Sequence, residues 1–234
     1  MLKNFVCTSL LIAIMTFYSS LVSAGTLDGK DLPTIQQRRL VLNPSSHTVF
    51  PEVYCNVANV EQIDIYSNSL TTLPSCINKF GRTLRSLSIA SNTSLTALPS
   101  EVGQLVFLET LTIKQTALAT LPSQISGARK LQNIQIVSGK LTSLPREIGD
   151  LVSLETLDLS NNLLPSLPEE MGLLTSLSNL NLSNNKLTVA PVFLPYLVNL
   201  KTITFTGNPL ATSDAQKEII KNIFKDRQTT VTFD

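Results

Sequence analysis

Leucines and other aliphatic residues recur at a fixed spacing along this chain between Val60 and Leu210. Seven segments follow the pattern L-x-x-L-x-L-x-x-N-x-L-x-x-L-P, and the clearest copy runs from Leu154 to Pro168. A period of about 20–29 residues with this signature predicts a solenoid of stacked coils. The segments start at nearly constant intervals, at Val60, Leu84, Leu108, Leu131, Leu154, Leu177 and Leu200.

Each segment predicts one strand and one return arc. The L-x-L pair alternates with period two, which indicates a short strand whose leucines point inward. Apolar residues after the proline recur at one place in the arc, so they would close the core from outside; they are Val102, Ile125, Ile148 and Met171. We therefore predict an α/β solenoid with a curved parallel sheet on the concave face and short helical or irregular convex arcs. No single coil can bury its leucines alone.

An asparagine at the ninth position of the pattern would end each strand. Its side-chain amide can satisfy backbone groups in the turn that no sheet partner reaches. Five coils carry it, at Asn68, Asn92, Asn162, Asn185 and Asn208. The third and fourth coils have Thr116 and Gly139 instead. We expect weaker turns there, by about 1 kcal/mol for a lost hydrogen bond.

The regular coils are flanked by two predicted caps. Residues 25–59 form the N-terminal cap, in which residues 37–59 are a degenerate repeat because Leu40 and Leu42 precede Ile63 and Ile65 by one repeat length. A separate small domain is the alternative, although so short a segment can hardly support one. Residues 60–210 are then seven repeats, and residues 211–234 are the C-terminal cap.

The C-terminal cap is predicted to be a helix followed by a strand. Ser213 and Gln216 have the spacing of a capping box, and alternating Val231 and Phe233 indicate a final strand. This tail would cover the open end of the sheet. An amphipathic helix that binds a partner is the alternative reading. The apolar face of the helix is expected to consist of Ile219, Ile220, Ile223 and Phe224.

Residues 1–24 have the order of a secretory signal peptide. Lys3 precedes an apolar run, and Val22-Ser23-Ala24 supplies the small residues of a cleavage site. A membrane anchor is the alternative, but the apolar run is shorter than the roughly 20 residues of a spanning helix. Cleavage after Ala24 predicts a secreted protein, extracellular or periplasmic, without stable membrane insertion.

The predicted mature chain is electrically neutral and keeps two of the three cysteines. Loss of residues 1–24 leaves 17 Lys and Arg against 17 Asp and Glu, which argues against nucleic acid as a partner. Cys55 and Cys76 lie just past the prolines of neighbouring coils, which run about 5 Å apart. We favour a disulfide between them, as a staple for the N-terminal end. Two free, buried thiols are the alternative.

The arcs carry a recognisable motif. Pro145–Leu151 and Pro168–Leu174 read P-R-E-I-G-D-L and P-E-E-M-G-L-L. These motifs resemble the leucine-rich repeat family, in its class of 23-residue repeats with L-P-x-E-I-G-x-L-x-x-L arcs. The resemblance implies a binding scaffold whose members engage proteins, less often glycans or lipids, on the concave sheet. It does not transfer a particular partner, because unrelated functions share the scaffold.

The outward strand positions would form a small, polar and almost uncharged surface. The central column of this surface is Asp64, Ser88, Thr112, Gln135, Asp158, Asn181 and Thr204. Tyr66 and Lys114 are the large residues near its axis. Our candidate ligand-binding residues are Tyr66, Lys114, Gln135, Asp158 and Asn181. Plain solvation of a polar sheet fits the same residues equally well. Asn92 and Asn181 also begin N-x-S/T sequences, the acceptor pattern for glycosylation.

Residue patterns for catalysis, metals or cofactors are absent from the sequence. His47 is the sole histidine, and no phosphate-binding loop occurs. We therefore expect no enzyme activity, no metal and no cofactor. Our hypothesis is a secreted recognition protein that binds a protein partner through its concave face. A glycan or cell-wall binding module is the alternative, and a hydrolase with an unrecognised site is a remote one.

Overall fold

The structure is a computed structural model that describes residues 34–36, 38–42, 48–66 and 69–234. The predicted signal peptide, His47 and Asn68 lie outside these residues. No helix in the described ranges is long and apolar enough to span a membrane.

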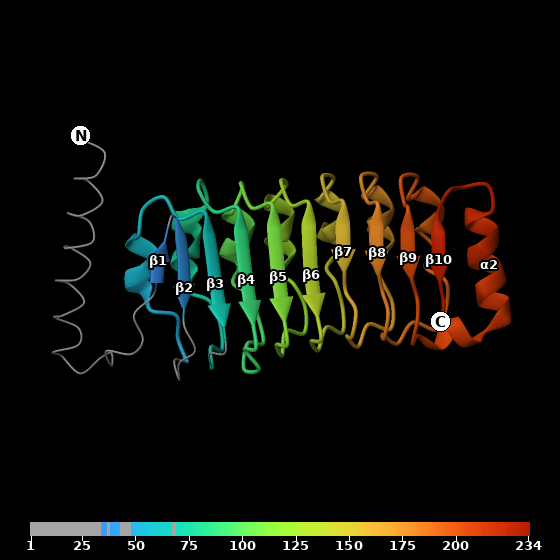
Figure 1. Cartoon of the computed structure of the whole chain (residues 1–234), viewed down its shortest axis with the longest axis horizontal. Coiled ribbons are helices and arrows are strands. Elements are labelled where there is room, and N and C mark those ends of the chain that lie inside the picture. The colour runs from blue at the N-terminus through green and yellow to red at the C-terminus, as the bar shows by residue number, and fades with distance from the viewer. Residues whose placement is uncertain (1–33, 37, 43–47, 67–68) are drawn as a thin grey trace.

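The described strands form one open sheet in which sequence order is also spatial order (Figure 1). The first strand is antiparallel to the second, and every later neighbour is parallel. The solenoid predicted from the repeat is therefore confirmed. The strands are β1 (Thr34–Gln36), β2 (Arg39–Leu42), β3 (Gln62–Tyr66), β4 (Ser86–Ala90), β5 (Thr110–Lys114), β6 (Asn133–Val137), β7 (Thr156–Asp158), β8 (Asn179–Asn181), β9 (Thr202–Thr204) and β10 (Thr230–Thr232).

The register of the sheet follows the repeat. Leu40 pairs with Ile63, and Leu42 pairs with Ile65, so the degenerate coil adds a strand at the offset expected from the repeat length. Asp64 is aligned with Ser88, and the predicted central column continues unbroken to β9. The exact limits assigned to the caps stay a prediction.

The return arcs are short 3₁₀ helices, which lie behind the sheet in Figure 1. Six of them follow a proline in extended conformation directly, because its fixed φ suits the entry to a turn. The 3₁₀ helices are η1 (Glu52–Asn56), η2 (Ser75–Phe80), η3 (Ser100–Gln104), η4 (Ser123–Gly127), η5 (Arg146–Asp150), η6 (Glu169–Leu173), η7 (Leu194–Tyr196) and η8 (Pro209–Thr212).

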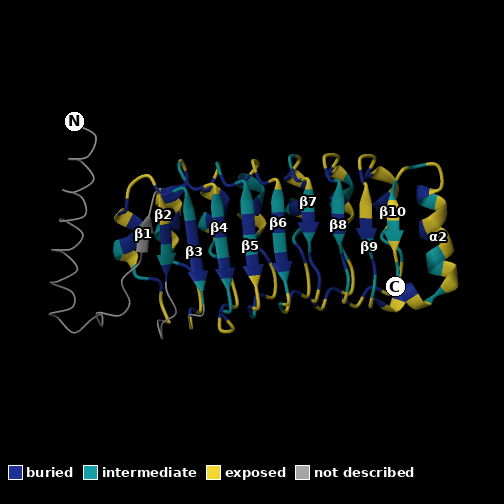
Figure 2. Cartoon of the chain, viewed as in Figure 1, coloured by how far each residue is buried: buried dark blue, intermediate teal, exposed yellow. Residues whose placement is uncertain are grey.

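One continuous hydrophobic core fills the space between the sheet and the arcs. Strand residues alternate between buried and half-buried, as Figure 2 shows along the row of strands. Burial of each Leu or Ile stabilises the fold by about 1.5–3 kcal/mol, and here most of it depends on neighbouring coils. The bulkiest fully buried side chains are Phe50, Phe80, Phe193 and Phe205.

A ladder of buried asparagines joins the turns after the strands. Asn185 Nδ2 donates to the carbonyl of Leu159 in the coil before, at 2.9 Å, and to Leu182 in its own coil, at 3.0 Å. Asn185 Oδ1 accepts from the backbone N of Leu164 at 3.1 Å. Asn162 and Asn208 make the same set of contacts, so the predicted role of the amide is confirmed.

The C-terminal cap is a helix followed by a strand, as predicted. Helix α2 (Asp214–Phe224) precedes β10, which pairs with β9. The capping box is only half formed. The backbone N of Gln216 donates to Ser213 Oγ at 3.4 Å, but Gln216 Oε1 accepts from the backbone N of Ala190 at 2.7 Å. The side chain of Gln216 therefore links α2 to the coil that contains η7, instead of completing the capping box at the start of the helix.

The predicted apolar face of α2 is wrong at one position. Ile220 and Phe224 are buried, and Ile223 is partly buried against the core, but Ile219 is 48% exposed. Three of the four apolar residues therefore pack against the core, and Ile219 faces solvent.

The N-terminal coils are cross-linked. Cys55 in η1 and Cys76 in η2 form a disulfide, with their Cα atoms 5.9 Å apart. The disulfide favoured from the spacing is confirmed, and the alternative of two free thiols is wrong. The bond joins the irregular first coil to the first regular one.

Candidate binding surface

The polar sheet face is the set of outward-pointing residues on β2 to β9, and it is the predicted concave face. In-register pairing places these residues in columns that cross the strands. The central column contains Asp64, Ser88, Thr112, Gln135, Asp158, Asn181 and Thr204, and all of these except buried Asp64 are half-exposed.

The N-terminal end of the polar sheet face holds a cluster around Asp64, which is only 2% exposed. Arg39 Nε donates to Asp64 Oδ2 at 2.5 Å, and Gln62 Nε2 donates to the same oxygen at 2.9 Å. Tyr66 OH donates to Asp64 Oδ1 at 3.2 Å. The hydrogen bond to Asp64 and its negative charge raise the pKa of the Arg39 guanidinium. The cluster is thus a neutral, mutually bonded unit.

Arg39 is a residue of this face that sequence reasoning missed. It lies on β2 in register with Gln62, and its side chain is 45% exposed while it pairs with Asp64. The repeat pattern could have identified Arg39, because it precedes Gln62 by one repeat length. The candidate Tyr66 therefore lies in a structural cluster, and a ligand there would meet Arg39 and Tyr66 together.

The middle of the polar sheet face holds two of the candidates. Lys114 is exposed at the end of β5, in register with Val137 on β6. Gln135 lies beside Thr112 and Asp158 and is half-exposed. These two candidates keep charged or amide groups available on adjacent strands.

Asp158 and Asn181 occupy equivalent places on adjacent strands. The backbone N of Ser160 donates to Asp158 Oδ1 at 2.9 Å, and that of Ser183 donates to Asn181 Oδ1 at 3.1 Å. Each side chain thus closes the turn after its own strand, a typical role for Asp and Asn. The five candidates share one face but extend from β3 to β8, which is about 24 Å at ordinary strand spacing.

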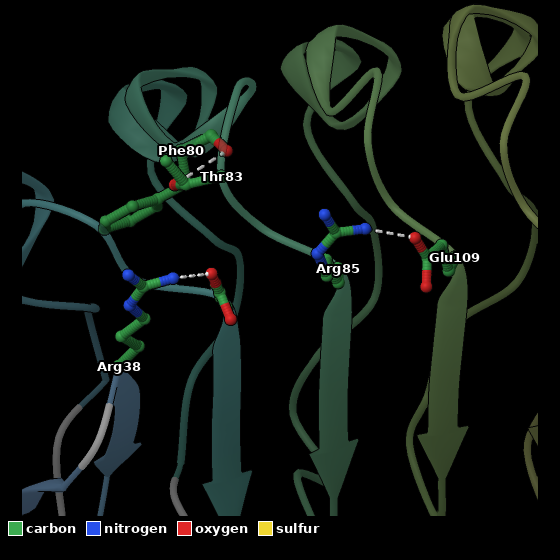
Figure 3. A network of polar contacts seen from close by, with 6 residues as sticks. Arg38, Phe80, Thr83, Arg85 and Glu109 are labelled. Carbon is green, nitrogen blue, oxygen red and sulfur yellow. Dashed lines mark hydrogen bonds and ion pairs between the residues drawn. The ribbon is translucent and has the colours of Figure 1, made fainter.

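The entrance of the strands carries paired charges (Figure 3). Arg38 forms an ion pair with Glu61, and Arg85 forms one with Glu109. All four side chains are at least a third exposed, so each pair contributes at most about 1 kcal/mol. These contacts are weak surface pairs between neighbouring coils.

The described residues contain no group of three or more His, Cys, Asp or Glu side chains that could hold a metal ion. Of the two glycosylation patterns, Asn92 is fully buried and Asn181 is half-exposed. The chemistry that the polar sheet face offers is hydrogen bonding by hydroxyl and amide groups, with Lys114 as an exposed charge.

The known proteins that this chain is similar to are leucine-rich repeat proteins. A family model described as leucine rich repeat matches residues 129–187. The structure of an LRR protein of Leptospira interrogans matches with a TM-score of 0.72 and 30% identity, covering 88% of this chain and 52% of that one. No curated protein sequence matches the chain.

Two plant receptors also share the fold. The LRR ectodomain of GASSHO1/SCHENGEN3 from Arabidopsis thaliana, in complex with CASPARIAN STRIP INTEGRITY FACTOR 2, matches with a TM-score of 0.61 and 22% identity, covering 85% of this chain and 25% of that one. The Arabidopsis receptor kinase HAESA, in complex with the peptide hormone IDA and the co-receptor SERK1, matches with a TM-score of 0.57 and 26% identity. That match covers 68% of this chain and 28% of that one. The chain thus spans about half the length of the bacterial protein and about a quarter of the plant chains.

Proposed function

Because the chain belongs to the leucine-rich repeat family, we propose that it is a non-enzymatic recognition module that binds a protein partner on its polar sheet face. The similar HAESA structure is a complex with a peptide hormone and a co-receptor, which supports a peptide or protein as the partner. Recognition on a rigid scaffold of this kind requires no catalytic group.

The observation that carries the proposal is that exposed Lys114 and half-exposed Gln135 lie on the adjacent strands β5 and β6. Their backbones are fixed by parallel pairing on both sides, so the positions from which the two side chains project are set before a partner arrives. A pre-organised surface loses less conformational entropy on binding. The partner would place acceptors over Lys114 and hydrogen-bonding groups over the amide of Gln135.

A glycan is the second candidate on the same face. The hydroxyls and amides of the central column carry few charges, and this composition suits a neutral, hydroxyl-rich ligand. Lys114 favours the protein partner, because an ammonium group binds an anionic peptide group more strongly than a neutral sugar hydroxyl. A glycan array probed with the intact protein separates the two.

We also infer that the protein is exported. The predicted signal peptide 1–24 and the Cys55–Cys76 disulfide support this, since disulfides persist in oxidising compartments. We also propose the domain limits given above, with caps at 25–59 and 211–234 on either side of the repeats at 60–210.

Site-specific photo-cross-linking tests the proposed face. A photoreactive residue replaces Gln135 in one variant and the exposed Val106 of the outer surface in the other, and each is irradiated in native extracellular material. We expect a discrete protein adduct from position 135 and none from position 106. An adduct from position 106 alone would contradict the proposal.

A further inference from the structure

The outer arcs stack tightly until the last regular coil, where the stacking changes. A Cβ on Gly103 would lie 1.9 Å from the carbonyl oxygen of Gln124, and one on Gly149 would lie 2.4 Å from that of Glu170. Glycine there lets one arc rest on the backbone of the next. A Cβ on Gly172 would instead meet side-chain atoms, Tyr196 Cδ2 at 3.2 Å and Phe193 Cβ at 3.4 Å.

The sequence explains this break. Pro195 occupies the place that Gly172 has one coil earlier, at the fourth position after the proline that opens the arc. The seventh arc reads P-V-F-L-P-Y-L, and η7 is shorter than η6. Side chains of the seventh arc therefore separate it from η6.

A groove of about 490 Å³ opens at this junction. Its apolar part includes Leu173, Val192 and Tyr196, which are 57%, 72% and 66% exposed. Apolar side chains this exposed and gathered in one groove are typical of a docking surface. Glu169, Glu170 and Phe193 complete the lining.

The groove also has unbalanced negative charge. Glu169 and Glu170 take part in none of the ion pairs found among the described residues. Glu147, which occupies the place of Glu170 one coil earlier, pairs with Arg146. Two carboxylates without a cation beside an apolar groove favour an occupant that brings its own positive charge.

We propose that this groove binds an extended, basic peptide segment of a partner protein. One Lys or Arg of the segment lies against Glu169 and Glu170, and a neighbouring Leu or aromatic side chain packs between Leu173, Val192 and Tyr196. The groove lies on the outer arcs, with the core between it and the polar sheet face. The two surfaces can therefore be occupied at once.

Binding of synthetic peptides to the intact protein tests the groove. The probe is an array of nonapeptides that each contain two basic side chains (Lys or Arg) and one Leu or Phe, with matched peptides in which Glu replaces the basic residues. We expect basic peptides to bind and acidic ones not to, with an affinity that falls as salt increases. The double variant Glu169→Gln/Glu170→Gln should weaken binding by about tenfold, and Val192→Ser by a similar factor.

Matched variants elsewhere on the arcs are the controls. Glu101 occupies the place of Glu170 three coils earlier, and Val152 is an exposed valine after another arc. Glu101→Gln and Val152→Ser should therefore leave peptide binding unchanged. Equal binding of basic and acidic peptides, or equal loss in the control variants, overturns the proposal. A dimer that Glu169→Gln/Glu170→Gln dissociates in analytical ultracentrifugation would assign the groove to a second copy and also overturn it. The cross-link at position 135 reports on the sheet face separately, because the groove takes no part in it.

Discussion

The side-chain oxygen of Asn162 accepts a hydrogen bond from the backbone N of Leu141, 3.1 Å away in the preceding coil. Its amide nitrogen donates to Ile136 in that coil at 2.7 Å and to Leu159 in its own at 2.9 Å. One buried side chain thus satisfies backbone groups in two coils that the sheet does not reach. The asparagine ladder therefore couples neighbouring coils as directly as the leucines do.

Asn162→Ala should lower the free energy of unfolding by about 2 kcal/mol, because it leaves buried backbone groups without partners. Urea unfolding followed by circular dichroism measures the loss. Asn92→Ala is the control, since Asn92 Oδ1 has no hydrogen-bond partner among the described residues and less is lost there. An equal shift in the two variants would show that the Leu141 contact contributes little.

The backbone N–H of Leu118 should exchange with solvent faster than that of Leu164. Leu164 donates to Asn185 Oδ1 at 3.1 Å, but the corresponding position for Leu118 is Gly139, which has no side chain. Leu118 donates instead to Thr116 Oγ1 at 3.4 Å, a longer contact that only partly replaces the amide. Hydrogen exchange by NMR measures both rates. Equally slow exchange near Gly139 and near Asn185 would refute the weaker turn.

The sheet and its register were predictable because each coil repeats the same packing problem. Leucines at period two can face only a shared core, so the alignment of Asp64 with Ser88 and of Leu40 with Ile63 follows from counting residues. The disulfide followed from the same count, since Cys55 and Cys76 had to lie on neighbouring coils.

Features that depend on a single side chain were not predictable. Ser91 and Gln115 adopt φ of 56° and 54° after their strands, a left-handed conformation that Asn184 and Gly207 signal in later coils but serine and glutamine do not. The side chain of Gln216 accepts from the backbone N of Ala190 instead of completing the capping box. This contact comes from another coil, so the local sequence of the helix does not predict it. The groove beside η7 depends on how Tyr196 packs against Gly172, which no local pattern encodes.

Gly103→Ala should lower the free energy of unfolding by about 2–3 kcal/mol, because the new Cβ would collide with the backbone carbonyl of Gln124. Gly172→Ala is the matched control on η6. Its Cβ would meet the exposed side chain of Tyr196, which can move, so we expect a loss below about 1 kcal/mol. Thermal and urea unfolding of both variants provide the comparison. Similar losses would mean that η6 and η7 stack as tightly as the other arcs.

Replacement of both Cys55 and Cys76 by alanine should lower the free energy of unfolding by about 3 kcal/mol, as expected for a bridge that closes a loop of this length. The N-terminal coils should unfold first in the variant, since the bond holds the first coil to the second. Intact mass with and without reductant verifies the bond, because reduction adds two hydrogens. A mass that does not change on reduction would show that the bond is absent.

Arg39→Ala should destabilise the protein much more than Arg38→Ala, although the two arginines are neighbours in sequence. Arg39 neutralises Asp64, which is 2% exposed, whereas Arg38 pairs with Glu61 at the surface. Removal of Arg39 leaves a buried carboxylate for which the described residues provide Gln62 and Tyr66 as the remaining side-chain donors. The surface pair, in contrast, is replaced by water at little cost. The difference in urea midpoint between the two variants measures this contrast. Raised salt should reduce the effect of Arg38→Ala and leave that of Arg39→Ala largely intact, because solvent ions screen exposed charges far more than buried ones. Equal midpoints would mean that Asp64 is stabilised by its neutral donors alone, and that Arg39 adds nothing to the stability of the N-terminal end of the sheet face.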